Sequence, residues 1–160
     1  MISLHRRLKA RLALVRADLD EAMGRLRDED LDWAPREGMR TVGGQLTEIA
    51  GTERQLLAWL RRQERIPFEL ANDFGDRAKS IEGMRGALEE VRGETLAYID
   101  SLSEDQLEAP VPMDPLWFES LGQKEVPLGE PIRSLAQHEW YHVGQLVSYL
   151  WSRGDDPYKW

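Results

Sequence analysis

The sequence contains no cysteine and only three histidines. Without cysteine the chain forms no disulfide, offers no thiol nucleophile of its own and supplies no thiolate ligand to a metal. Any metal that it binds must therefore be held by histidine, carboxylate or solvent.

Long apolar runs are also absent. The chain has no stretch of about 18 apolar residues, and its start lacks the apolar segment of a secretion signal. Basic residues are in the minority, with 21 lysines and arginines against 29 acidic residues and a formal net charge of -8. This acidity repels phosphate backbones and anionic lipid headgroups. We therefore expect a cytoplasmic protein that binds neither nucleic acid nor a membrane.

Apolar residues recur every three or four positions in four segments, which is the pattern of helices buried on one side. The predicted helices cover about 4–26, 41 to just before Pro67, 80–102 and 131–153. Thr41 suits an N-cap, and Pro131 suits a first helical position. With 160 residues, the chain is long enough for one domain.

Residues 103–130 separate the third and fourth predicted helices and contain prolines at 110, 112, 115 and 127. The segment is too long for a simple bundle turn, and loops of this length are often functional. The sequence thus predicts an all-α fold with a single domain over residues 1–160. We expect a four-helix bundle with a long crossover loop between its third and fourth helices.

The most informative motif is His138-Glu139-Trp140-Tyr141-His142 on the fourth predicted helix. Residues four apart share a helix face, so both imidazoles can reach one cation, and the spacing predicts a metal site. The same string satisfies the H-E-x-x-H signature of zinc metalloproteases, in which the glutamate acts as general base. Little of the chain follows the motif, and the sequence predicts no strand pair before it, so we do not expect the usual context of that signature.

Residues 41–53 (TVGGQLTEIAGTE) and 135–146 (LAQHEWYHVGQL) resemble the DinB/YfiT-like superfamily of metal-binding four-helix bundles. The resemblance covers nearly the whole chain. It implies two metal-ligating histidines on the last helix, at His138 and His142, and a third on the second helix. At that third position this sequence has Glu48. Either Glu48 is a carboxylate ligand, or the site has lost a ligand.

Glu48 borders the apolar stripe that Leu46 and Ile49 mark, where an unpaired carboxylate is costly to desolvate. A cation or an arginine would offset that cost. Two histidines and a carboxylate suit a catalytic divalent ion, and we consider zinc, nickel, iron and manganese. The alternatives are a solvated Glu48 and a pair of hydrogen-bonded core histidines.

Three neighbouring side chains also bear on the site. Gln145 could bind a ligand oxygen or support an imidazole, and Tyr141 could line the mouth of a pocket. Glu139 is a candidate catalytic acid or base, although an outward salt bridge also suits its place on the helix. His5, near the start of the first helix, is interpreted as a surface residue.

The resemblance also implies a function. Some members of the superfamily transfer low-molecular-weight thiols to electrophilic small molecules with the help of a divalent ion, and the family suggests a homodimer. Hydrolysis of a small substrate with Glu139 or Glu48 as base is another enzymatic alternative. The alternative outside enzymes is a non-catalytic bundle that binds a ligand or a second copy of itself and retains a degenerate metal site.

Overall fold

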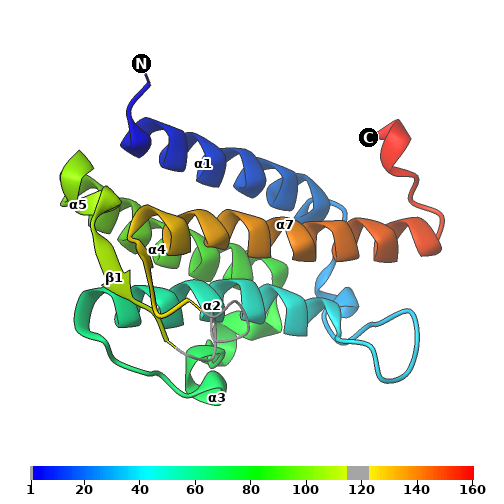
Figure 1. Cartoon of the computed structure of the whole chain (residues 1–160). Coiled ribbons are helices and arrows are strands. Elements are labelled where there is room, and N and C mark those ends of the chain that lie inside the picture. The colour runs from blue at the N-terminus through cyan, green and yellow to red at the C-terminus, as the bar shows by residue number, and fades with distance from the viewer. Residues whose placement is uncertain (1, 115–122) are drawn as a thin grey trace.

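The computed structural model describes residues 2–114 and 123–160. Its main elements are four long helices: α1 (Leu4–Met23), α2 (Val42–Arg62), α4 (Ile81–Asp100) and α7 (Gly129–Ser152). Figure 1 shows them lying side by side along one direction. Their bounds lie within a few residues of the predicted ones, and the all-α four-helix bundle is confirmed.

Small hydroxylated side chains set where three of these helices begin. Ser3, Thr41 and Ser80 are the N-caps of α1, α2 and α4, and each accepts a hydrogen bond from the backbone N–H three residues further on. The N-cap predicted at Thr41 is thus confirmed. α7 begins at Gly129 rather than at Pro131, and its N-cap residue, Leu128, has no side chain that could accept a capping hydrogen bond.

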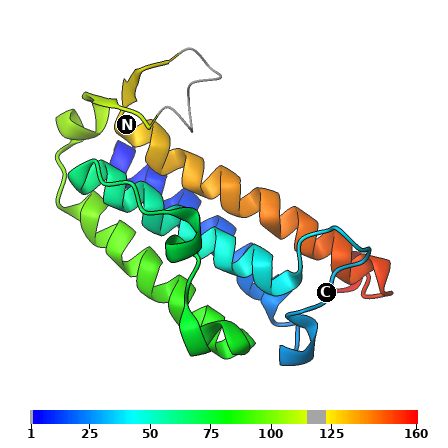
Figure 2. The same cartoon turned by 90° about the horizontal axis from the view of Figure 1, so that it is seen from below.

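The four helices form a ring in which α1 packs against α7, α7 against α2, α2 against α4, and α4 against α1. Hydrogen bonds and ion pairs between them show that α1 and α7 run in one direction and that α2 and α4 run in the other (Figures 1 and 2). Because α2 and α4 are parallel, residues 63–80 must return along the bundle. This segment carries α3 (Phe68–Ala71) and the 3-10 helix η2 (Gly75–Lys79).

The crossover therefore lies between α2 and α4, not between α4 and α7 as expected. α4 ends and α7 begins at the same end of the bundle, near the start of α1. The segment between them folds into α5 (Glu104–Glu108) and two short antiparallel strands, β1 (Pro110–Pro112) and β2 (Glu125–Pro127), which pair Val111 with Val126. The middle of the predicted functional loop, residues 115–122, lies outside the described residues.

The core lies between the four long helices, each of which contributes fully buried leucines such as Leu12, Leu46, Leu88 and Leu146. The smaller elements η1 (Asp28–Asp30) and η4 (Pro157–Lys159) flank the bundle. In the described ranges, no helix combines the length and the apolar character that a membrane span requires.

His5 ties the start of α1 to the segment that follows α4. Its Nδ1 lies 2.5 Å from Glu104 Oε1, and its Nε2 lies 2.7 Å from the carbonyl oxygen of Leu102. Because both oxygens can only accept, both ring nitrogens donate and the imidazole is protonated. The hydrogen bond with Glu104 raises the pKa of His5, and the same bond is the main cause that lowers the pKa of Glu104 to about 2. The prediction of a plain surface histidine missed this pairing.

The pair predicts a pH dependence of stability. Because the pKa of His5 is raised in the folded protein, its pairing stabilises the fold fully at pH values below the ordinary pKa of 6.5. This stabilisation is lost as the pH rises through the pKa of His5 in the folded protein. A lowered Glu104 pKa adds stability that is complete above 4.5 and is lost as the pH falls toward about 2. We expect His5→Gln to lower the free energy of unfolding most between pH 4.5 and pH 6.5, the ordinary pKa values of the two groups. Urea titrations of both proteins at about pH 5.5 and pH 9 measure this, and an equal difference at both pH values would contradict it.

Candidate metal centre

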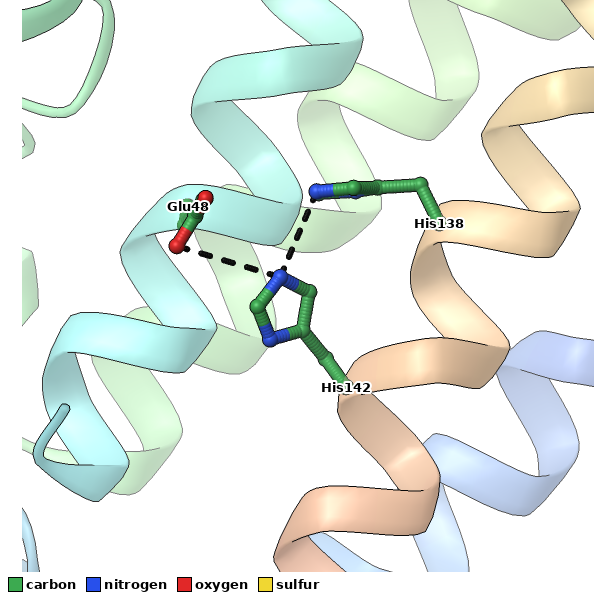
Figure 3. A group of neighbouring side chains, drawn as sticks. All are labelled: Glu48, His138 and His142. Atoms are coloured by element: carbon green, nitrogen blue, oxygen red, sulfur yellow. Dashed lines mark hydrogen bonds and ion pairs between the residues drawn. The ribbon is translucent and has the colours of Figure 1, made fainter. Parts of the chain in front are cut away.

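Glu48 on α2 and both His138 and His142 on α7 point into the same space between the two helices (Figure 3). One donor atom from each lies within 4.8 Å of the other two. The Nε2 atoms of the two histidines are 3.3 Å apart, and His142 Nε2 lies 3.8 Å from Glu48 Oε2. The three residues selected from the sequence are therefore brought together.

The donor set fits a divalent metal ion. Two nitrogen ligands at the usual zinc distance of about 2.0–2.1 Å and a tetrahedral angle are about 3.3 Å apart. The Nε2 atoms of His138 and His142 have this separation. Two imidazoles and one carboxylate, with no sulfur, are a set that zinc, iron and manganese accept.

Both histidines are held in the neutral form, which is the form that binds metals. Burial lowers the pKa of His138, and the positive charge of Arg40 lowers it further, while Glu53 opposes the change. For His142, burial is again the largest cause, and His138 and Arg40 add to it, so that the pKa falls to about 4. Near neutral pH, each imidazole therefore has a free lone pair.

Gln45 lies beside the ring nitrogen of His142 that faces away from the other candidate ligands. Its Oε1 lies 3.4 Å from His142 Nδ1, and the glutamine is completely buried on α2. A proton on Nδ1 can donate to this amide oxygen, which leaves the Nε2 lone pair directed at His138 and Glu48. Gln45 was not predicted from the sequence, although its position three residues before Glu48 places both on one helix face.

A pocket of about 270 Å³ opens beside these donor atoms. Its lining consists of Met39, Arg40, Glu48, Tyr141, His142, Gln145 and Tyr149. Gln145 and Tyr141 are thus neighbours of the candidate ligands. The Tyr141 side chain is largely exposed, and its ring stands edge-on to the His142 ring, with centroids 5.2 Å apart.

Arg40 precedes α2 and forms an ion pair with Glu48 through Nη1 and Oε2. The Glu48 side chain is only 19% exposed. The sequence predicted that a carboxylate here would need a cation or an arginine to offset its desolvation. In this structure, Arg40 is that arginine.

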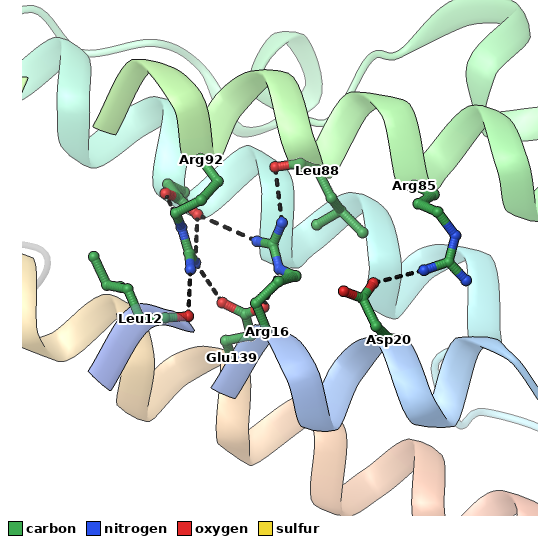
Figure 4. A network of polar contacts seen from close by, with 8 residues as sticks. Leu12, Arg16, Asp20, Arg85, Leu88, Arg92 and Glu139 are labelled. Carbon is green, nitrogen blue, oxygen red and sulfur yellow. Dashed lines mark hydrogen bonds and ion pairs between the residues drawn. The ribbon is translucent and has the colours of Figure 1, made fainter. Parts of the chain in front are cut away.

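Glu139 points away from the histidines. It belongs to a buried charge quartet, formed by Arg16, Glu53, Arg92 and Glu139, with one residue from each long helix (Figure 4). Arg92 donates to Glu53 at 2.8 and 3.0 Å and to Glu139 Oε2 at 2.5 Å. Arg16 Nε donates to Glu139 Oε1 at 2.6 Å. The guanidinium groups thus occupy both carboxylate oxygens of Glu139.

The expectation of an outward salt bridge at Glu139 is wrong, since this side chain is 1% exposed. Its catalytic role stays a prediction, and the two arginine contacts disfavour it, because a general base needs an oxygen that can reach a substrate. Burial opposes the charge of Arg92, but the two carboxylates outweigh burial and raise its pKa. Apolar periodicity marks only the apolar positions of α1, so the inward-facing Arg16 was not predicted from the sequence.

Comparison with known protein families gives one match. A family model described as the DinB superfamily matches residues 11–146, a range that contains all three candidate ligands. No curated protein is significantly similar to the chain. The match spans most of the bundle, from within α1 into the second half of α7.

Proposed function

The chain belongs to the DinB superfamily, and we propose that it is a metal-dependent enzyme that transfers a low-molecular-weight thiol to an electrophilic small molecule. One observation carries the proposal: three donor atoms converge within 4.8 Å beside a pocket. Glu48, His138 and His142 would hold a divalent ion, for which zinc, nickel, iron and manganese are candidates.

A divalent ion at these residues would supply Lewis acidity, which lowers the pKa of a thiol or water that it coordinates. The chain itself has no cysteine, so the attacking thiol must come from a separate small molecule. Gln45 would keep the His142 ring oriented, and Gln145 and Tyr141 would offer an amide and a phenol to a substrate in the pocket. Glu139 has no part in this proposal because its carboxylate is paired inside the bundle.

The second candidate function is a non-catalytic bundle with a degenerate metal site. The contact between Arg40 and Glu48 favours it, because an arginine then neutralises the carboxylate without any metal. The two candidates differ in metal content. The homodimer that the family suggests is a separate proposal, and light scattering of the purified protein tests it.

Metal analysis and a thiol assay test the enzyme proposal. Protein prepared with added metal is expected to retain close to one ion per chain. The loaded protein should then speed the loss of free thiol from a mixture of a small thiol and an aryl halide, and a chelator should stop this. Metal-free protein would favour the degenerate bundle. Bound metal without thiol consumption would keep the centre and reject the transferase.

Glu48→Gln tests the carboxylate ligand. The change keeps the size of the side chain but removes its charge, so we expect metal affinity to fall by at least about tenfold. Calorimetric titration with zinc measures the affinity. Glu89→Gln, on the exposed side of α4, is the matched control and should bind zinc like the unmodified protein. Equal affinity in the Glu48 and Glu89 variants would remove Glu48 from the ligand set.

A further inference from the structure

Arg40 is a charged residue in the lining of the pocket, and the proposed thiol transfer does not by itself give it a role. Its backbone is fixed, because its carbonyl oxygen accepts a hydrogen bond of 2.9 Å from the Tyr149 hydroxyl on α7. Its side chain passes over Gly44, where an added Cβ would lie 3.0 Å from Arg40 Cγ. Because the backbone of Arg40 is fixed and its side chain is flexible, the guanidinium can move while the Cα atom stays beside the pocket.

The guanidinium and a metal ion would compete for the same oxygen. Arg40 Nη1 contacts Glu48 Oε2, and this oxygen also faces His142 Nε2 at 3.8 Å. A divalent ion bound there would take over the negative charge of Glu48 and repel the guanidinium at short range. The Arg40 side chain is 45% exposed, so it has space to turn away from Glu48.

Metal binding would also change the charge of the pocket. Among the described residues that line it, Glu48 is the only acid and Arg40 the only permanent cation. With a divalent ion on Glu48, the pocket gains a net positive charge, and the guanidinium loses its partner. A guanidinium without a partner recognises carboxylates, phosphates and sulfonates through paired N–H donors.

We propose that Arg40 neutralises Glu48 in the metal-free protein and, once an ion is bound, holds an anionic group on the small thiol. The inference rests on the proposed function and specifies its substrate class as an anionic thiol. The pocket volume of about 270 Å³ suits a small molecule and lies below the range of about 300–1,000 Å³ for drug-sized ligands. The protein as a whole has a net charge of -8, so its surface outside the pocket would repel such an anion.

The first test compares the cobalt(II) affinity of three variants by calorimetry. Arg40→Met removes the competing cation, and we expect its affinity to rise by roughly fivefold, the upper range for an exposed ion pair. Arg40→Lys keeps the charge and should stay near the unmodified protein. Arg36→Met, in the same segment but outside the pocket lining, is the control and should change nothing.

The second test uses cobalt-loaded protein and two thiols that differ only at one end, 3-mercaptopropane-1-sulfonate and 3-mercaptopropan-1-ol. A sulfonate is a weak metal ligand, so a preference for it reports on the guanidinium. We expect the unmodified protein to bind the sulfonate at least about tenfold more tightly than the alcohol. Arg40→Met should bind both thiols alike.

The outcomes separate the two proposals. Equal cobalt affinity of the unmodified and Arg40→Met proteins would overturn the competition but leave the metal centre intact. A sulfonate preference that survives in Arg40→Met would overturn the substrate role. If neither protein binds cobalt, the metal centre fails, and this inference fails with it. Cobalt binding by Arg40→Met alone would support the competition.

Discussion

His142→Ala is expected to abolish stoichiometric metal binding, with a loss of affinity of more than about 100-fold. His142 Nε2 is the central donor atom, because it lies 3.3 Å from His138 Nε2 and 3.8 Å from Glu48 Oε2. Without it, the two remaining ligands stand on different helices with an empty space between them. Elemental analysis and competition with a chelator measure the effect.

His5→Ala is the matched control for this experiment. His5 is the third histidine of the chain, and its two ring nitrogens contact Glu104 and Leu102. This variant should therefore keep its metal. Circular dichroism should show the same helical content in both variants, so that unfolding does not explain the loss. Retention of one ion per chain by His142→Ala would contradict the assigned ligand set.

Arg92→Met is expected to have the largest effect on stability, a loss of about 3–5 kcal/mol in the free energy of unfolding. Arg92 is 6% exposed, and it donates to Glu53, Glu139 and the carbonyl oxygen of Leu12. Removing it leaves two buried carboxylates with Arg16 alone as their partner, and an uncompensated buried charge is expensive. Denaturation in urea measures the loss.

Arg85→Met provides the comparison on the same helix. Arg85 pairs with Asp20 on α1, where the two side chains are 27% and 44% exposed, so its removal should cost less than about 1 kcal/mol. Combining Arg92→Met with Glu53→Gln should recover part of the loss, because fewer unpaired charges then remain. Equal losses for Arg92→Met and Arg85→Met would show that the quartet contributes no more than a surface pair.

The quartet also bears on the metal centre. Glu139 directly follows His138 on α7, and its contacts with Arg16 and Arg92 fix how this helix is rotated about its axis. With Glu139 held toward α1 and α4, the His138 ring is directed toward α2 and Glu48. The position of a ligand thus depends on buried ion pairs outside the ligand set.

Local sequence patterns predicted the four long helices well. Apolar periodicity marked their buried faces, and the cap at Thr41 marked the start of α2. The crossover was misplaced because no local pattern encodes the direction of a helix in the bundle. The longest segment between helices was taken for the crossover, whereas the shorter residues 63–80 make the return.

The candidate site was predictable only where spacing or family resemblance gave a signal. The four-residue spacing identified His138 and His142, and the resemblance singled out Glu48. Gln45 was missed because its partner His142 lies on another helix. Arg40 was missed because it precedes α2, so helical spacing does not place it beside Glu48. The sequence around each member of the quartet does not indicate that the side chain is buried, because its oppositely charged partners lie on other helices.

An anomalous-scattering map from crystals grown with a divalent metal shows directly whether Glu48, His138 and His142 share one ion. We expect one peak within about 2.0–2.3 Å of His138 Nε2, His142 Nε2 and a Glu48 oxygen, with the Arg40 guanidinium turned away from Glu48. A map without a peak between these side chains, with Arg40 still on Glu48 at saturating metal, would contradict it.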